Sequence, residues 1–287
     1  MRSGISVVML SLNEAHNMER VCKNLAGWAT NVYLVDSYSK DDTVSIALKH
    51  GVTVVQRKFK DFGDQWNFAI NELPINTHWT MKLDPDEQLT DDLKRQINAI
   101  MELDDETCGI EMVRRLWFMR RPLPQSHRIL RVWRTGACHF TDVAVNEHPI
   151  VNGKIVRING EIEHHDSPNL HHWIEKQNRY STAEAVIAFK NLSLAATPSI
   201  LGTSLQRRMW LKKHFHRIPF RFTILFFCLY VVNGLWRAGW VGYTWSRLRV
   251  DVLRLLEMKK REMQLLGHVP VACEFGAGEP DSRVQQY

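Results

Sequence analysis

Three acidic residues lie within four positions in the stretch MKLDPDEQL, which covers residues 81–89. Asp84, Asp86 and Glu87 directly follow a run of apolar residues, and Pro85 stiffens the turn between the two aspartates. Like charges this close repel one another, so either the turn is solvated or a cation neutralises it. Because Mg²⁺ and Mn²⁺ bind one or two carboxylates together with substrate phosphates, the D-x-D spacing indicates a divalent-cation site.

Two further polar clusters also follow apolar runs. VVMLSLNEAHN places Leu12, Asn13 and Glu14 where a predicted strand ends, and VYLVDSYSKDDT places Asp36 at the end of the next one. A carboxylate in this position accepts hydrogen bonds from a ribose or a base. The simpler alternatives are that Glu14 is a first-turn helix residue favoured by the helix dipole and that Asp36 caps a turn. Three clusters at three strand ends favour a shared site.

The first hundred residues alternate between predicted strands and helices. The strands are ISVVML, NVYLVD, VTVVQR and HWTMKLD, and the helices are EAHNMERVCKNLAGW, SKDDTVSIALKHG, DQWNFAINEL and DDLKRQINAIMEL. This alternation predicts βαβ units and a mostly parallel sheet, in which ligands bind at the carboxyl ends of the strands. In the second helix we expect Ser39 or Asp41 as the cap and Gly51 as the stop.

From about residue 108 the pattern changes. CGIEMVRRLWFM, SHRILRVWR, DVAVNEHPIV and KIVRINGEIEHHD predict short antiparallel strands joined by turns, and a helix is predicted from Leu170 to Phe189. The length of 287 residues fits one large domain or one domain with an added module, and the hydrophobic content of 45% is enough for a core. Five scattered cysteines without a C-x-x-C spacing favour a reducing compartment, and the first residues do not form a signal peptide.

Residues 198–262 carry most of the positive charge. They contain thirteen Lys or Arg and three acids, a net charge of +10, which leaves −4 for the rest of a chain whose total is +6. Within them, residues 222–232 are uncharged and are followed by Trp236, Trp240, Tyr243 and Trp245. This pattern predicts a helix pair in one leaflet of an anionic membrane. A buried hairpin of a soluble bundle or an oligomer interface is the alternative.

Several motifs together resemble a known family. VVMLSLNEAHNMERVCKNL, VYLVDSYSKDDTVSIALKHG and WTMKLDPDEQL resemble, in order and spacing, the nucleotide-sugar half of family 2 glycosyltransferases. FKDFGDQWNFAI, RILRVWRTGACHF, NEHP, EIEHHDS and NGLWRAGWVGY resemble its lipopolysaccharide-core β-1,4-glucosyltransferase branch. The resemblance covers roughly residues 4–265. Tyr38 stands where glycine is usual in the family, and Asn146 where histidine is common.

The resemblance implies an α/β fold of the GT-A (Rossmann-like) type, with a mixed sheet and C-terminal amphipathic or hydrophobic helices. It also implies an inverting transferase that uses a nucleotide-diphospho-sugar, with UDP-glucose suggested. Asp36 would contact the nucleobase or ribose, and Asp84 and Asp86 would hold Mg²⁺ or Mn²⁺ on the diphosphate. Inversion needs a single carboxylate base, for which we choose Glu147, with Asp142 in reserve. An exposed acid at a strand end is the alternative for Glu147.

Further residues complete the predicted site. Of the adjacent histidines in EIEHHDS, which point to opposite faces of a strand, we expect His165 to contact the metal or phosphate. Arg128 and Arg131 are expected to steady a phosphate or an acceptor anion by forked hydrogen bonds. Gln65 and Asn67 are expected to organise the donor pocket, with a polar helix start as the alternative.

The predicted organisation has four parts. Residues 1–107 form the nucleotide-sugar half and 108–197 the acceptor-side half of one GT-A domain, 198–265 a membrane-associating helical segment, and 266–287 a loosely ordered tail. We expect a lipid-linked or lipopolysaccharide-type saccharide as acceptor and a cytoplasmic enzyme, peripheral or monotopic on the inner face of the plasma membrane. Nucleic acid is not expected as a partner. The alternatives are a nucleotidyltransferase and a non-enzymatic protein that binds membranes or nucleic acid through the basic segment.

Overall fold

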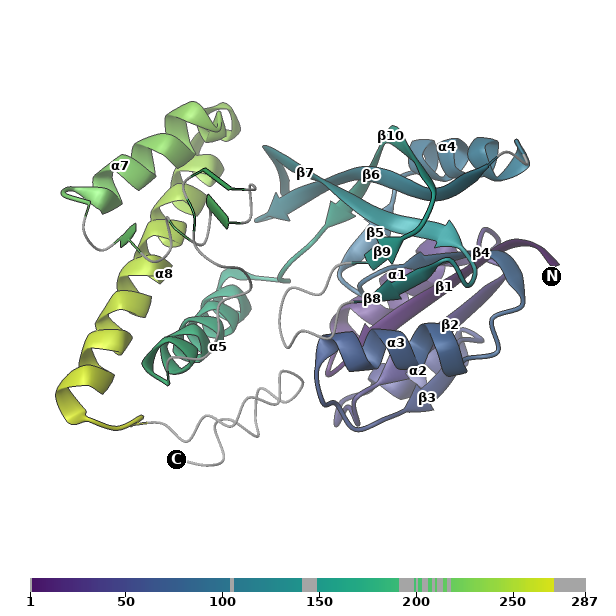
Figure 1. Cartoon of the computed structure of the whole chain (residues 1–287), viewed down its shortest axis with the longest axis horizontal. Coiled ribbons are helices and arrows are strands. Elements are labelled where there is room, and N and C mark those ends of the chain that lie inside the picture. The colour runs from purple at the N-terminus through teal and green to yellow at the C-terminus, as the bar shows by residue number, and fades with distance from the viewer. Residues whose placement is uncertain are drawn as a thin grey trace. The chain divides into compact units, whose positions relative to one another are not determined.

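The computed structural model describes residues 2–103, 106–140, 149–190 and 218–270, together with residues 199, 201–202, 206–207, 210 and 214–215. The chain divides into two compact units, which are drawn together in Figure 1. Unit 1 takes in the chain up to Pro168 except Leu123–Gln125, and unit 2 takes in the helical segment that begins at Asn169.

Unit 1 is built on an eight-stranded mixed sheet with the strand order β3-β2-β1-β4-β7-β6-β10-β5. Its strands are β1 (Arg2–Ser11), β2 (Asn31–Asp36), β3 (Thr53–Gln56), β4 (Thr77–Lys82), β5 (Glu87–Leu89), β6 (Thr107–Phe118), β7 (Arg121–Arg134) and β10 (Lys154–His164). The neighbours β3, β2, β1 and β4 are mutually parallel. The parallel sheet predicted for the first hundred residues is therefore confirmed.

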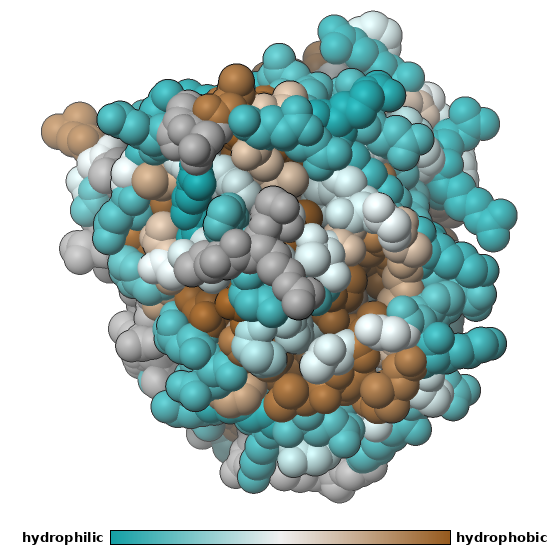
Figure 2. Space-filling view, turned by 90° about the vertical axis from the view of Figure 1, so that its right-hand side faces the viewer, coloured by the Kyte–Doolittle hydropathy of each residue, from teal (hydrophilic) through white to brown (hydrophobic). Residues whose placement is uncertain are grey.

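Helices cover both faces of this parallel half. The helices of unit 1 are α1 (Ala15–Leu25), α2 (Thr43–Lys49), α3 (Phe62–Glu72) and α4 (Asp91–Glu102). Side chains of α1, α2 and α4 share one core cluster with Val7 and Met9, whereas α3 shares the other with Val8, because successive strand residues face opposite sides. On the side of the molecule shown in Figure 2, hydrophilic side chains cover most of the surface, with apolar areas between them.

The start of α2 differs from the prediction. The residue before its first turn is Asp42, and neither Ser39 nor Asp41 is the N-cap. Ser39 instead donates its backbone N–H to Asp36 at 2.9 Å, and Asp41 accepts a hydrogen bond from the backbone of Ala15 at 3.1 Å. The loop before α2 is thus tied to the neighbouring loop, which delays the helix. The chain leaves α2 through Gly51, whose φ of +75° suits glycine.

The second half of the sheet is only partly antiparallel, which corrects the prediction of short antiparallel strands. β6 and β7 form a long antiparallel hairpin, and β7 also pairs with β4 in antiparallel fashion. β10, however, pairs with β6 in parallel. The reason is topological, because the chain crosses back between β7 and β10 through β8 (Cys138–Phe140) and β9 (Pro149–Val151). Residues 141–148, which connect β8 to β9, lie outside the described residues.

Unit 2 is helical. It contains α5 (Leu170–Phe189), α7 (Arg221–Phe227), the π-helical turn η2 (Cys228–Val232), the 3₁₀ turn η3 (Leu235–Ala238) and α8 (Gly239–Leu266). The helix predicted at 170–189 is therefore confirmed. It packs on α8, where the rings of Trp173 and Trp245 lie 5.6 Å apart and Arg249 donates to Gln177 at 3.2 Å.

These contacts place α5 in the helical unit 2. The prediction assigns α5 to the acceptor-side half that ends at residue 197. In the structure α5 packs on α8, and the two compact units divide between Pro168 and Asn169. Lys259 strengthens the attachment, because its ammonium group donates to the hydroxyl groups of Ser181 and Thr182. At the C-terminal end α8 continues to Leu266, and residues 271–287, most of the predicted loose tail, lie outside the described residues.

Large apolar side chains are exposed along the turn of unit 2 that joins α7 to α8. They are Phe220, Ile224, Phe227, Val231, Val232, Trp236, Trp240 and Tyr243. The turn is tight, since a β-carbon on Gly242 would lie 1.8 Å from the carbonyl oxygen of Leu235. Among the described residues no single helix is both long and apolar enough to cross a membrane. The bent pair Arg221–Val232 and Leu235–Leu266, at 70° to each other, passes that test of length and composition when taken together.

Candidate active site

The carboxyl ends of β1, β2 and β4 lie at one end of the sheet. Ser11 is level with Asp36 in the β1–β2 register, and Val8 is level with Lys82 in the β1–β4 register. The loops after β1 and β2 and the turn after β4 consequently lie at this common end, where ligands of parallel sheets bind. The structure thus brings together the three polar clusters that the sequence places at strand ends.

Hydrogen bonds join the loop after β1 to the loop after β2. The backbone N–H of Asn13 donates to the hydroxyl of Ser39, and the backbone N–H of Lys40 donates to the amide oxygen of Asn13, each at 2.8 Å. The N–H of Glu14 donates to the hydroxyl of Thr43 at 2.8 Å. Asn13 has a φ of +55°, which asparagine tolerates better than most residues. The two loops therefore form one rigid rim.

The remaining residues of the first motif have local roles in this rim. Leu12 is half-buried between Ser11 and Asn13. Glu14 is the N-cap residue of α1 without a capping side-chain bond, and its carboxylate instead accepts a hydrogen bond from Asn17 at 2.8 Å. Glu14 therefore stands just before the first turn of α1 and not within it, as the alternative had it. Contacts of Leu12, Asn13 and Glu14 with a nucleotide stay a prediction.

Asp36 is completely buried and organises the loop that follows it. Its carboxylate accepts hydrogen bonds from the hydroxyl of Ser11 at 2.9 Å and from the side-chain amide of Gln56 at 3.0 Å. It also accepts from both the backbone N–H and the hydroxyl of Ser39. With these donors in place, Asp36 fixes the path of the loop. A direct contact between Asp36 and a nucleobase or ribose stays a prediction.

Gln65 and Asn67 hold neighbouring segments in place. Gln65 is buried in α3, accepts a hydrogen bond from Arg57 at 2.7 Å and donates to the hydroxyl of Ser37 at 3.4 Å. The side-chain amide of Asn67 both donates to the carbonyl of Phe140 at 3.0 Å and accepts from its N–H at 2.9 Å. Gln65 thus supports the loop after β2, and Asn67 anchors β8 to α3.

The turn after β4 is closed by a buried arginine. Arg131 donates from Nη2 to Asp84 at 2.8 Å and to Glu87 at 2.6 Å, and Glu87 accepts the backbone N–H of Asp84 at 3.1 Å. Burial alone raises the pKa of Asp84, but the charges of Arg131 and Lys82 outweigh it and lower the pKa below the ordinary value. Burial raises the pKa of Glu87, an effect that Arg131 opposes. Asp84 is therefore the carboxylate that stays ionised most readily.

The two arginines expected to bind anions have protein partners. Arg131 is only 5% exposed, and its contacts with Asp84 and Glu87 make it a support of the acidic turn. Arg128 lies three residues before Arg131 in β7. It is exposed, and it donates to the carbonyl of Ile158 at 3.0 Å and to the side chain of Asn159 at 2.7 Å. Contacts of either arginine with a phosphate or an acceptor anion stay predictions.

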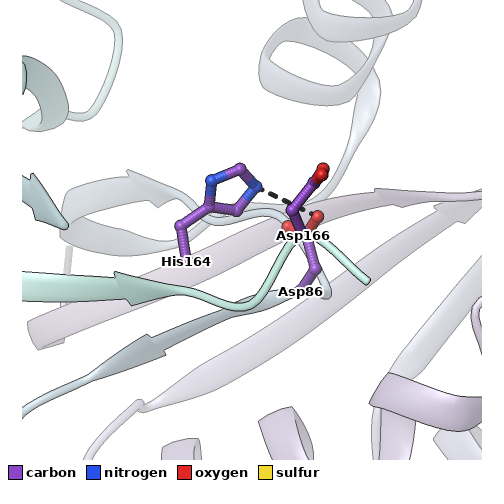
Figure 3. A group of neighbouring side chains, drawn as sticks. All are labelled: Asp86, His164 and Asp166. Carbon is purple, nitrogen blue, oxygen red and sulfur yellow. Dashed lines mark hydrogen bonds and ion pairs between the residues drawn. The ribbon is translucent and has the colours of Figure 1, made fainter. Parts of the chain in front are cut away.

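Asp86, His164 and Asp166 form a group in which one potential ligand atom from each residue lies within 4.8 Å of the others (Figure 3). His164 ends β10, and its Nε2 is 3.2 Å from Oδ2 of Asp86. Burial lowers the pKa of His164, but the Asp86 carboxylate outweighs it, and the net pKa is raised. Two carboxylates and an imidazole converge here from the turn after β4 and from the end of β10.

The histidine in this group is His164, whereas the sequence favours its neighbour His165. The ring of His165 lies against Trp117, with centroids 5.0 Å apart, and its Nε2 is 3.1 Å from Glu163. His165 is not in the group with Asp86, so the grouping favours His164 as the candidate ligand, and a contact of His165 with a metal or phosphate stays a prediction. Asp166 was not predicted at all. It stands two residues after His164, and this i, i+2 spacing on an extended chain is the sequence signal that favours a common side.

The predicted base residues cannot be placed. Glu147 and Asp142 both fall in residues 141–148, outside the described part of the chain. Their roles stay predictions.

The donor set fits a divalent cation that also accepts nitrogen. Carboxylate oxygens suit Mg²⁺ and Mn²⁺, and imidazole suits transition metals, so Asp86, His164 and Asp166 together are compatible with Mn²⁺. Asp84 stands on the same turn, ionised and 37% exposed, and presents a further carboxylate. Such a group at the carboxyl end of a parallel sheet can hold a cation against the phosphates of a nucleotide.

Comparison with known proteins identifies the family. Residues 6–140 match the family model described as glycosyl transferase family 2. An uncharacterized glycosyltransferase of Rickettsia conorii is 26% identical in an alignment of 196 residues that covers 63% of this chain and 69% of the relative. Residues 6–140 thus carry the glycosyl transferase family 2 region, and the expected GT-A type of fold, with its mixed sheet and C-terminal helices, is confirmed.

Other relatives extend the similarity beyond residue 140. The lipopolysaccharide core biosynthesis glycosyltransferase LpsC of Rhizobium meliloti is 23% identical in an alignment of 250 residues that covers 83% of this chain and 85% of LpsC. The resemblance to the lipopolysaccharide-core branch is thereby supported along most of the chain. Among solved structures, Staphylococcus aureus TarS matches with a TM-score of 0.44 and 14% identity, over 85% of this chain and 55% of TarS. Glucosyl-3-phosphoglycerate synthase of Mycobacterium tuberculosis, in complex with Mn²⁺, UDP and phosphoglyceric acid, matches with a TM-score of 0.31 and 20% identity, over 41% and 44% of the chains.

Proposed function

We propose that this family 2 glycosyltransferase transfers a sugar, with inversion, from a nucleotide-diphospho-sugar to a saccharide acceptor of the lipopolysaccharide type. The observation that carries the proposal is the group Asp86, His164 and Asp166 beside the D-x-D turn, at the carboxyl end of the parallel strands. The similarity to LpsC, whose name places it in lipopolysaccharide core biosynthesis, supports the acceptor class. A UDP-sugar, with UDP-glucose as the first choice, is the proposed donor.

Asp86, His164 and Asp166 would hold Mg²⁺ or Mn²⁺. When bound, the cation supplies positive charge to the diphosphate leaving group. Asp84 adds negative charge next to it and is kept ionised and in place by Arg131. Because Arg131 also contacts Glu87, the acidic turn keeps one shape when the cation and the donor exchange.

The reaction is a single displacement. An acceptor hydroxyl oxygen forms a bond to the anomeric carbon while the bond from that carbon to the phosphate oxygen breaks. The nucleoside diphosphate leaves with the electron pair of the broken bond, and the hydroxyl proton passes to a carboxylate. Glu147 is the proposed base, with Asp142 in reserve, because one attack in line with the leaving group needs only one base.

The exposed apolar residues around the turn between α7 and α8 support a location on a membrane. Phe220 is 83% exposed, Val232 77% and Trp240 68%, in a chain segment whose net charge is +10. Trp and Tyr favour the water–lipid boundary, and Lys and Arg are attracted by anionic headgroups. The proposed location is therefore the inner face of the plasma membrane, peripheral or monotopic, where a lipid-linked acceptor is within reach. A second copy of the chain covering the same residues is the alternative.

Thermal-shift screening of the whole protein against nucleotide sugars, with and without Mn²⁺, tests the substrate class. We expect a shift for one donor that depends on the metal and is absent in Asp86→Ala. Equal shifts with and without Mn²⁺ would count against the proposed cation site. No shift with any nucleotide sugar would count against the proposed activity.

A further inference from the structure

Tyr38 adopts an unusual backbone conformation in the loop after β2. Its φ is +62°, in the left-handed region that favours glycine and, among other residues, asparagine and aspartate. A tyrosine there costs free energy that a glycine would not cost. The residue is 52% exposed, so burial in the protein core does not offset this cost. Strained residues that persist on a surface are concentrated at functional sites.

The backbone on both sides of Tyr38 is held firmly. Before it, Ser37 donates its N–H to the carbonyl of Ser11 at 2.9 Å. After it, Ser39 donates its N–H to the buried carboxylate of Asp36 at 2.9 Å and accepts the N–H of Asn13 at 2.8 Å. The loop therefore cannot relax easily to relieve the strain at Tyr38. The exposed ring is attached to a rigid backbone.

The position of Tyr38 matches the base end of a bound nucleotide. It lies two residues beyond β2, and the D-x-D turn that carries Asp86 follows β4 at the same end of the sheet. With β1 between them, β2 and β4 are two strand spacings apart, about 10 Å. An extended nucleoside diphosphate can bridge such a separation, with its phosphates at the acidic turn and its base near the loop after β2.

We propose that the ring of Tyr38 stacks on the nucleobase of the donor and contributes affinity to the nucleotide site. The inference rests on the proposed function, since it needs a nucleotide-diphospho-sugar donor. Stacking of a base on an aromatic ring accepts any base, so Tyr38 supplies affinity more than base selectivity. The phosphates are bound elsewhere, so a ligand without a base gains nothing from the ring.

The test compares Kd values for UDP and for inorganic pyrophosphate, both with Mn²⁺, in the whole protein. Tyr38→Gly removes the ring and suits the backbone, so the variant folds at least as stably as the wild type. Tyr38→Asn also tolerates a positive φ and keeps a side chain, which guards against a loosened loop. Tyr38→Phe keeps the ring. Tyr180→Ala in α5 is the matched control, because Tyr180 is 51% exposed.

We expect Tyr38→Gly and Tyr38→Asn to bind UDP roughly 5- to 150-fold more weakly, the range that corresponds to loss of one stacked base. Their pyrophosphate affinity should be unchanged, and Tyr38→Phe and Tyr180→Ala should match the wild type. UDP affinity equal to that of the wild type in Tyr38→Gly would overturn the inference while leaving the proposed function intact. An equal loss for UDP and pyrophosphate would also overturn it, since the loop and not the ring would then be responsible. A wild type that binds neither UDP nor other nucleoside diphosphates would overturn the proposed function and the inference with it.

Discussion

Arg131 donates to the carboxylate of Glu87 at 2.6 Å, and both side chains are shielded from solvent, Glu87 completely. Two strands far apart in the sequence, β5 and β7, are thereby linked beneath the acidic turn. A buried ion pair is costly to break, because removing one partner leaves an uncompensated charge. The shape of the turn that presents Asp84 and Asp86 depends on this pair.

Replacement of Arg131 by methionine should lower the free energy of unfolding by about 3–5 kcal/mol, the usual cost of leaving a buried charge unpaired. Urea unfolding measures it. The double variant Arg131→Met with Glu87→Gln removes both charges and should recover part of that loss. If the double variant loses as much free energy of unfolding as the two single variants lose together, or more, the pair does not have the role assigned to it.

His164 and His165 provide a matched pair for the cation site. His164→Ala removes a potential ligand next to Asp86, whereas His165→Ala removes a ring that contacts Trp117 and Glu163. Loss of groups that only orient a ligand costs about 10- to 100-fold in metal affinity, so loss of a ligand should cost at least about tenfold. Calorimetric titration with Mn²⁺ should show this loss for His164→Ala and little change for His165→Ala. The opposite ranking would restore His165 as the ligand.

Glu147→Gln tests the proposed base. Binding of the donor should persist, because the base does not contact the nucleotide, while transfer should fall by about 10²- to 10⁴-fold, the usual contribution of a positioned base. Steady-state rates and donor Kd values separate the two effects. A severe loss in Asp142→Asn together with a mild one in Glu147→Gln would exchange the two roles.

The basic residues before the apolar turn should hold the protein on anionic lipid. Each Lys or Arg near such a surface contributes about 1 kcal/mol, so glutamine at Arg207, Arg208, Lys212 and Lys213 should weaken sedimentation with vesicles that contain phosphatidylglycerol. The control replaces four exposed cations of unit 1, namely Lys23, Lys49, Arg95 and Arg157. High salt should release only part of the wild type, because Trp236 and Trp240 stay buried in lipid. A wild-type protein that does not bind these vesicles and forms stable dimers would favour the alternative that the apolar residues form an interface between two copies of the chain.

Some features of the fold could be predicted because they are encoded locally. The helix at 170–189 follows Asn169, whose side chain accepts the N–H of His172 and caps it. The acidic turn was predictable because an apolar strand precedes Asp84 directly. Both patterns occupy one short window, so no knowledge of distant contacts was needed.

Other features depend on contacts between distant segments. The register of β10 against β6 shifts between Arg157 and Glu161, where four steps along β10 match two steps along β6. His164 pairs with Glu87 of β5. No pattern around the two histidines reveals this pairing, so the sequence alone could not tell which of them lies beside Asp86. The partner of Arg131 is likewise set by the pairing of β7 with β4, which leaves no trace in the residues around Arg131.

The most direct test of the central claim is the product released from the donor. Purified protein is supplied with UDP-sugars, a lipopolysaccharide-type acceptor and Mn²⁺, and the released phosphates are separated by chromatography. We expect a nucleoside diphosphate in an amount equal to the sugar transferred, and loss of most of this release in Asp86→Ala. Release of pyrophosphate in place of the nucleoside diphosphate would identify a nucleotidyltransferase, and unchanged release in Asp86→Ala would contradict the assigned cation site.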